Sequence, residues 1–173
     1  TMADPFVGKL TLFRVLSGTV NSDSSIWNAS QNQEERVGQL FLIKGKNQIS
    51  VSSLSAGDIG AVAKLQATAT SDTLCAKDNP LLLQKLEFPK PKLTMAVLPK
   101  SKGDEEKISS GLNRLLDEDP TIQVEKDSVT HELLLSGLGD LHLEVITSKL
   151  QKKFGTEVEL KDPKIPYKET IKG

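Results

Sequence analysis

Cysteine, aromatic residues and long apolar runs are scarce in this chain of 173 residues. The single cysteine, Cys75, excludes an intrachain disulfide and a thiolate metal cluster, and we expect it to be a buried structural thiol. Aromatic residues make up only 4% of the sequence, so the cores must be aliphatic. No apolar run approaches the roughly 20 residues of a membrane-spanning helix, and no signal-like segment opens the chain. These absences predict a cytoplasmic protein without a membrane partner.

The sequence also lacks a strong charge of either sign. Its formal net charge is -1 at pH 7. Affinity for phosphate depends on clustered Lys and Arg, so this balance argues against a self-sufficient nucleic-acid binder.

Phosphate-binding loops are missing too. The two Gly-Lys pairs, at residues 8–9 and 45–46, are not followed by Ser or Thr and have no glycine at the required upstream position. Gly137 and Gly139 lack the third glycine of a dinucleotide fingerprint, and they predict a tight turn instead. The sequence therefore predicts no GTP site and no bound cofactor within this chain.

The acidic residues and histidines do not form a catalytic or metal-binding pattern. Asp140, His142 and Glu144 fall two residues apart in an expected helix, so their side chains point in different directions and cannot converge on one ion. We expect His131 to occupy a surface position of a strand, between Thr130 and Glu132. The sequence thus predicts no metal site and no catalytic residue.

Two prolines, Pro89 and Pro91, divide the chain. Proline disfavours both helix and central strand, so residues 87–92 are expected to form a stiff, extended linker between a domain at 1–86 and a domain at 93–173. In the first domain, short strand-like runs alternate with turn residues, which indicates a β-sandwich or a small barrel. The expected strands span residues 10–16, 26–27, 37–43, 49–51, 59–65 and 73–75.

The second domain has alternating helical and strand periods. A strand at 93–98 is followed by a capping-box pattern at Ser101 and Asp104, and then by a helical stripe that Pro120 must end. A hairpin follows, with strands at 121–125 and 131–135. A second helical stripe ends at Gly155, before a last strand. The stripes consist of Ile108, Leu112, Leu115 and Leu116 in the first helix and Leu143, Ile146, Leu150 and Phe154 in the second. The order βαββαβ is that of an α+β ferredoxin-like domain.

Four segments of the second half resemble the third domain of elongation factor G, a translational GTPase. They are residues 88–91, 115–121, 136–154 and 166–171. The chain before Phe88 resembles the second domain of that factor, in which residues 56–62 match a turn and strand of a translation-factor barrel. The resemblance implies an all-β barrel followed by the ferredoxin-like domain. It also implies a parent protein that couples GTP hydrolysis to ribosomal translocation.

Partners and site residues follow from this resemblance alone. It implies contacts with the ribosome, through small-subunit ribosomal RNA and ribosomal proteins, and with the G domain of the same parent chain, where GTP and magnesium would bind. Thr121, Leu141 and His142 match family positions at the G-domain and fusidic-acid-type interface. We expect Leu141 to belong mainly to the core, and Glu118 and Asp119 to form a solvated helix end.

Three alternatives stay open at this point. The first alternative is a divergent paralogue of the factor. Ile122 stands where the family commonly has Phe, and residues 137–140 read Gly-Leu-Gly-Asp where Gly-Met-Gly-Glu is common. A ribosome-protection protein that confers tetracycline resistance would share the same domain plan. The third is a stand-alone module that binds RNA or a regulator, but it would need aromatic residues on the sheet, and the hairpin strands carry none.

Overall fold

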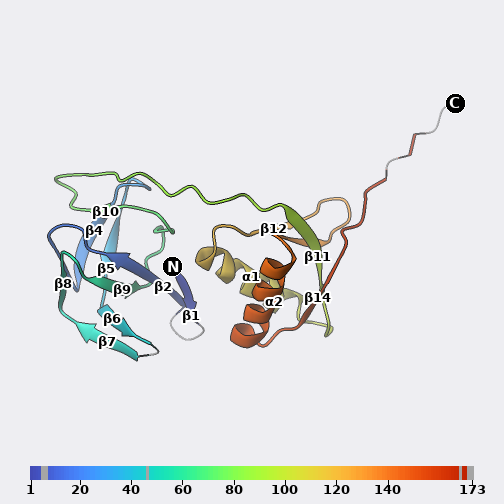
Figure 1. Cartoon of the computed structure of the whole chain (residues 1–173), viewed down its shortest axis with the longest axis horizontal. Helices are drawn as coiled ribbons and strands as arrows, with labels where there is room; N and C mark the ends of the chain where they lie inside the picture. Colours follow the sequence, from blue (N-terminus) through green and yellow to red (C-terminus); the bar gives the residue numbers. More distant parts are fainter. Residues whose placement is uncertain (5–7, 46, 168, 171–173) are drawn as a thin grey trace. The chain divides into compact units, whose positions relative to one another are not determined.

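The structure is a computed structural model that describes residues 1–4, 8–45, 47–167 and 169–170. The chain divides into two compact units, Thr1–Glu87 and Phe88–Gly173 (Figure 1). Each unit has its own hydrophobic core.

Among its described residues, the first unit contains strands but no helix. Five form an antiparallel sheet in the order β1 (Met2–Asp4), β2 (Gly8–Arg14), β9 (Ile59–Ala63), β6 (Leu40–Lys44) and β7 (Asn47–Val51). Three others pair in the order β10 (Leu74–Cys75), β4 (Ser24–Asn28) and β5 (Gln33–Val37), and β3 (Thr19–Asn21) pairs with β8 (Ser53–Ser55). Side chains from these strands and from residues close to their ends form one aliphatic core, made of Val15, Val37, Leu40, Leu54, Val62 and Leu65. This arrangement confirms the predicted barrel-like fold.

The short strands β1, β3 and β8 lie outside the predicted runs, and two other details of this unit also differ from the prediction. The run 37–43 is not one strand, because the chain leaves β5 at Val37 and enters β6 at Leu40, in another sheet. Gly38 lies at the crossing, where its carbonyl accepts the N–H of Asp23 at 3.2 Å. Cys75 is half-buried rather than buried, because β10 is an edge strand that pairs only with β4.

The second unit has the predicted order βαββαβ. Its elements are β11 (Leu93–Pro99), α1 (Glu105–Glu118), β12 (Gln123–Lys126), β13 (Leu133–Gly137), α2 (Asp140–Phe154) and β14 (Val158–Lys161). The sheet order is β12-β13-β11-β14, and all pairs are antiparallel, as in a ferredoxin-like fold. The buried residues of both helical stripes join one core with Val97, Ile122 and Leu135.

The ends of the two helices are set by different means. The expected capping box is wrong: α1 begins at Glu105 with Asp104 as its N-cap, and no side chain caps it. Gly103, at φ +90°, turns the chain immediately before that point, so Ser101 lies outside the helix. The second helix, α2, ends at Gly155, which has the left-handed conformation, as predicted.

The β12–β13 connection corrects the placement of His131. The carboxylate of Asp127 accepts the N–H groups of Val129 at 2.8 Å and Thr130 at 2.7 Å, and the N–H of His131 bonds the Asp127 carbonyl. This turn holds His131 at φ +59°, outside both strands, so its predicted strand position is wrong.

Candidate functional site

Two connections of the second unit meet at the candidate site. The first leads from the end of α1 through Asp119 and Thr121 toward β12, and the second leads from β13 through Gly137 into α2. His142 lies in the first turn of α2, as the sequence predicted. It therefore faces a segment that precedes it by about twenty residues in the chain.

Asp119 links the predicted residues Thr121 and His142. Its Oδ1 atom accepts the backbone N–H of Thr121 at 2.9 Å and the Thr121 hydroxyl at 2.6 Å. Its Oδ2 atom lies 3.0 Å from Nε2 of His142. Burial by itself raises the pKa of Asp119, but the hydrogen bonds from Thr121 and His142 outweigh it and hold that pKa below its ordinary value.

The hydrogen bond at the second ring nitrogen of His142 indicates the tautomer of the neutral ring. Nδ1 lies 3.1 Å from the backbone N–H of Leu138, which can only donate, so Nδ1 is the unprotonated acceptor. The neutral ring then carries its proton on Nε2 and donates it to Asp119. The histidine side chain is 17% exposed and ties the β13–α2 turn to the end of α1.

The adjacent end of α1 is not the solvated helix end that the sequence predicted. The side chain of Glu118 is largely buried, and its two oxygens accept Lys149 Nζ at 2.8 Å and Lys153 Nζ at 2.6 Å, both from α2. Asp119 is likewise half-buried in its hydrogen bonds. The two carboxylates thus hold the end of α1 against α2.

Leu141 lies outside the core, so its expected core position is wrong. Its side chain is 74% exposed, whereas Leu143 is buried. Two residues along a helix point in nearly opposite directions, so only one of these leucines can face the sheet. Leu141 joins Leu138 and Val145, both more than 40% exposed, in what we call the α2 apolar patch.

Gly137 allows the turn before α2 to pack closely. A Cβ atom at this position would lie 2.7 Å from Leu143 Cδ2 and 3.1 Å from His142 Nδ1. Any other residue would therefore require the Leu143 or His142 side chain to shift.

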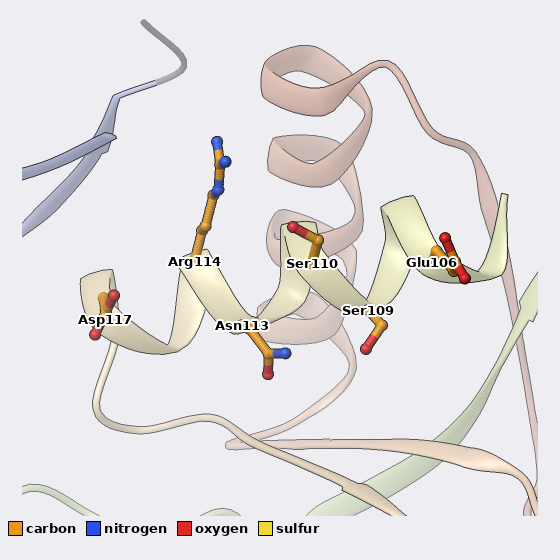
Figure 2. A pocket seen from close by; sticks show the side chains of 6 residues that line it. All are labelled: Glu106, Ser109, Ser110, Asn113, Arg114 and Asp117. Atoms are coloured by element: carbon orange, nitrogen blue, oxygen red, sulfur yellow. The ribbon is translucent and has the colours of Figure 1, made fainter. Parts of the chain in front are cut away.

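A hollow on the outer face of α1 lies apart from these residues. Figure 2 shows its lining, which comes from one helix: Glu106, Ser109, Ser110, Asn113, Arg114 and Asp117. The guanidinium of Arg114 lies 5.8 Å from the ring centre of Phe154. Because the lining is polar and belongs to a single helix, the hollow is an open surface feature and not an enclosed binding cavity.

Two further observations concern the part of the chain that the structure describes. Within it, no three His, Cys, Asp or Glu side chains lie close enough together to hold a metal ion. Neither α1 nor α2 has the length and apolar character needed to cross a bilayer.

Comparisons with known proteins agree with the two-unit architecture. Residues 1–77 match the family described as elongation factor G domain 2, and residues 88–162 match elongation factor G, domain III. A crystal structure of a protein from Thermus thermophilus is similar over 99% of this chain, with a TM-score of 0.80 and 33% sequence identity. The chain spans 26% of the length of that protein. The chain therefore belongs to the elongation factor G family and contains its second and third domains.

Proposed function

We propose that this chain is part of a cytoplasmic translation factor that couples GTP hydrolysis to ribosomal translocation. In this proposal, the parent protein binds GTP and magnesium in a separate G domain. The first unit contacts small-subunit ribosomal RNA and ribosomal proteins, and the second unit contacts the G domain. The chain itself transmits nucleotide state between domains and performs no chemical step.

The hydrogen-bond network around Asp119 is the observation that supports the proposed contact with the G domain. It joins Thr121, His142 and the Leu138 amide by hydrogen bonds of 3.1 Å or less, and so fixes the turn that presents Leu138 and Leu141. An exposed leucine held at a fixed helix start is suited to an apolar partner surface, because little entropy is lost on binding. We therefore assign Leu141 to direct contact, and Thr121 and His142 to positioning it. The same surface is proposed as the fusidic-acid-type interface.

A charge placed on the α2 apolar patch tests this assignment. We expect Leu141→Glu in the full-length parent to lower ribosome-stimulated GTP turnover about tenfold, the effect of losing roughly 1.4 kcal/mol of interface free energy. Val129→Glu is the matched control, because Val129 is 59% exposed on the β12–β13 connection, at the opposite end of those strands. Equal turnover of the two variants would refute the contact.

A second assay distinguishes a translocation factor from a ribosome-protection protein. We expect the parent protein to advance messenger RNA by one codon on a pre-translocation ribosome, which a toeprint assay measures. A parent that releases tetracycline from the ribosome without moving messenger RNA would instead support the ribosome-protection alternative.

The face of the second sheet away from the helices argues against a stand-alone RNA-binding module. Strand pairing aligns Gln123, Ser136 and Thr94 on this face, and Glu125, Leu134, Ala96 and Lys161 in the next row. Ser136 and Thr94 bond each other through their hydroxyls at 2.7 Å. Among these positions there is no aromatic ring on which a base could stack.

A further inference from the structure

The two ring nitrogens of His142 have partners of different kinds. Nδ1 accepts the backbone N–H of Leu138 at 3.1 Å, and Nε2 lies 3.0 Å from Oδ2 of Asp119. A backbone N–H can only donate a hydrogen bond, whereas an ionised carboxylate can only accept one. A neutral ring with its proton on Nε2 therefore satisfies both partners. A charged ring carries a proton on each nitrogen, so it satisfies Asp119 alone.

Asp119 remains an acceptor in both charge states of the ring. Burial raises the pKa of Asp119, but the hydrogen bonds from Thr121 and His142 outweigh burial and hold that pKa below its ordinary value of 3.8. Histidine ordinarily changes its charge between about pH 5 and 8, where this carboxyl is ionised. A second proton on the ring converts the Nε2 contact into a charge-assisted hydrogen bond, which is stronger than the neutral one. The charged ring therefore stays bonded to Asp119.

Leu138 loses its partner when the ring is charged. Nδ1 and the Leu138 nitrogen would then both carry protons at a separation of 3.1 Å, where two donors repel each other. The carbonyl groups on either side of Leu138 are bonded to the flanking elements: that of Gly137 accepts the Lys92 N–H at 2.8 Å, and that of Gly139 accepts the bond that begins α2, at 3.1 Å. These bonds do not involve the ring, so the change is confined to the turn at 137–139.

The charges near the ring have both signs. On the α1 side, Asp119 contacts the ring directly, and the neighbouring Glu118 is paired with two lysines of α2, Lys149 at 2.8 Å and Lys153 at 2.6 Å. On the α2 side, Asp140 is exposed in the first turn, where the positive end of the helix dipole also lies. The turn between β13 and α2 contributes uncharged residues. Because Asp119 is hydrogen-bonded to the ring, it determines which bond survives when the ring is charged.

We propose that His142 is a pH-sensitive switch for the turn at residues 137–139. The neutral ring holds the Leu138 N–H, and the charged ring releases it while remaining bonded to Asp119. Release changes how the turn presents Leu138, which belongs with Leu141 to the α2 apolar patch. The switch follows from the hydrogen bonds of the second unit, and only its effect on the G-domain contact rests on the proposed function.

Nuclear magnetic resonance of the 173-residue chain tests the switch. The chain has two histidines, so His131 is replaced first to leave His142 as the only one. His131→Asn suits this purpose, because His131 has a φ of +59° and asparagine tolerates the left-handed conformation. Ring ¹⁵N spectra show which nitrogens of His142 carry protons. Hydrogen exchange, corrected for the ordinary dependence of amide exchange on pH, reports the protection of the Leu138 N–H.

We expect the Leu138 amide to lose protection as the ring gains charge between about pH 8 and 5. The loss should be about tenfold, the effect of one hydrogen bond. The Thr121 amide should keep its protection, because its acceptor is Asp119. The proposal would be overturned by unchanged Leu138 protection while the ring gains charge, by a proton on Nδ1 at the higher pH, or by a ring that is still neutral at about pH 5.

Two variants separate the two bonds of the ring. His142→Asn places an amide oxygen near the position of Nδ1 and cannot gain a charge, so protection of the Leu138 amide should not depend on pH. His142→Gln places its amide near the position of Nε2, so it can bond Asp119 but leaves the Leu138 N–H without its acceptor. Protection of Leu138 should then be low at both pH values. If His142→Asn shows the same pH dependence as the wild-type ring, the change arises elsewhere and the proposal is wrong.

The parent protein shows whether the switch acts on the proposed contact. The ratio of ribosome-stimulated GTP turnover, wild type to His142→Asn, should fall as the pH is lowered, and the ribosome's own pH dependence cancels in this ratio. A constant ratio beside a pH-dependent Leu138 amide would count against the proposed G-domain contact, while the amide result would still support the switch. A Leu138 amide that does not respond to the charge on the ring would refute the switch whatever the parent does.

Discussion

Removing the Asp119 carboxylate should loosen the turn that presents Leu141. In Asp119→Ala, the Thr121 N–H, the Thr121 hydroxyl and His142 Nε2 all lose their acceptor. Each hydrogen bond has a net worth of about 0.5–1.5 kcal/mol, and water replaces part of this at a half-exposed site. We expect the free energy of unfolding of the second unit to fall by about 1–3 kcal/mol.

Circular dichroism measures the unfolding of the second unit separately from that of the first unit. The described helices, α1 and α2, both belong to the second unit, so urea unfolding followed at 222 nm reports on that unit. The fluorescence of Trp27, the one tryptophan of the chain, reports on the first unit. Glu144→Ala is the control, since Glu144 is an exposed carboxylate on α2, and it should change stability by no more than about 0.5 kcal/mol.

The pH dependence of a second variant at this position, Asp119→Asn, follows from the lowered pKa of Asp119. A carboxylate whose pKa is lower in the folded state contributes stability above its ordinary value, here 3.8, and loses it as the pH falls toward the folded pKa. The difference in free energy of unfolding between the wild-type chain and Asp119→Asn should therefore be constant near neutral pH. It should disappear as the pH falls below about 4. The network would have no energetic role if Asp119→Ala cost no more than Glu144→Ala, or if the difference did not depend on pH.

Two further substitutions test how each unit packs. Gly111→Ala should destabilise the second unit by about 1–3 kcal/mol despite the better helix propensity of alanine, because its Cβ would lie 2.6 Å from Leu150 Cδ1. An unchanged or raised unfolding midpoint at 222 nm would contradict this. Asn28→Ala should destabilise the first unit by about 2–4 kcal/mol, since it leaves the Ser30 and Gln31 N–H groups and the Thr68 hydroxyl without their bonds to a fully buried amide. A shift of the Trp27 fluorescence transition, with the transition at 222 nm unchanged, would be the expected result.

Several features of the fold were determined by the sequence alone, because they depend on neighbours within one or two turns. The helical stripes included the buried leucines and isoleucines of both helices, Pro120 placed the end of α1, and Gly155 placed the end of α2. The same periodicity could have identified Leu141 as exposed. It lies two residues from Leu143 and so falls off the stripe.

Other features depended on residues that are distant in the chain, and only the tertiary structure decided them. Nothing local shows that Asp119 bonds His142, 23 residues later, or that Glu118 pairs with two lysines of α2. The break after Val37 likewise arises because β5 and β6 pair with different strands. The turn before β10 is also joined to β4, by the hydrogen bond between Asp72 and Asn28. A hydrogen bond or a buried contact depends on where two groups meet in space, and sequence periodicity describes only the face of a single element.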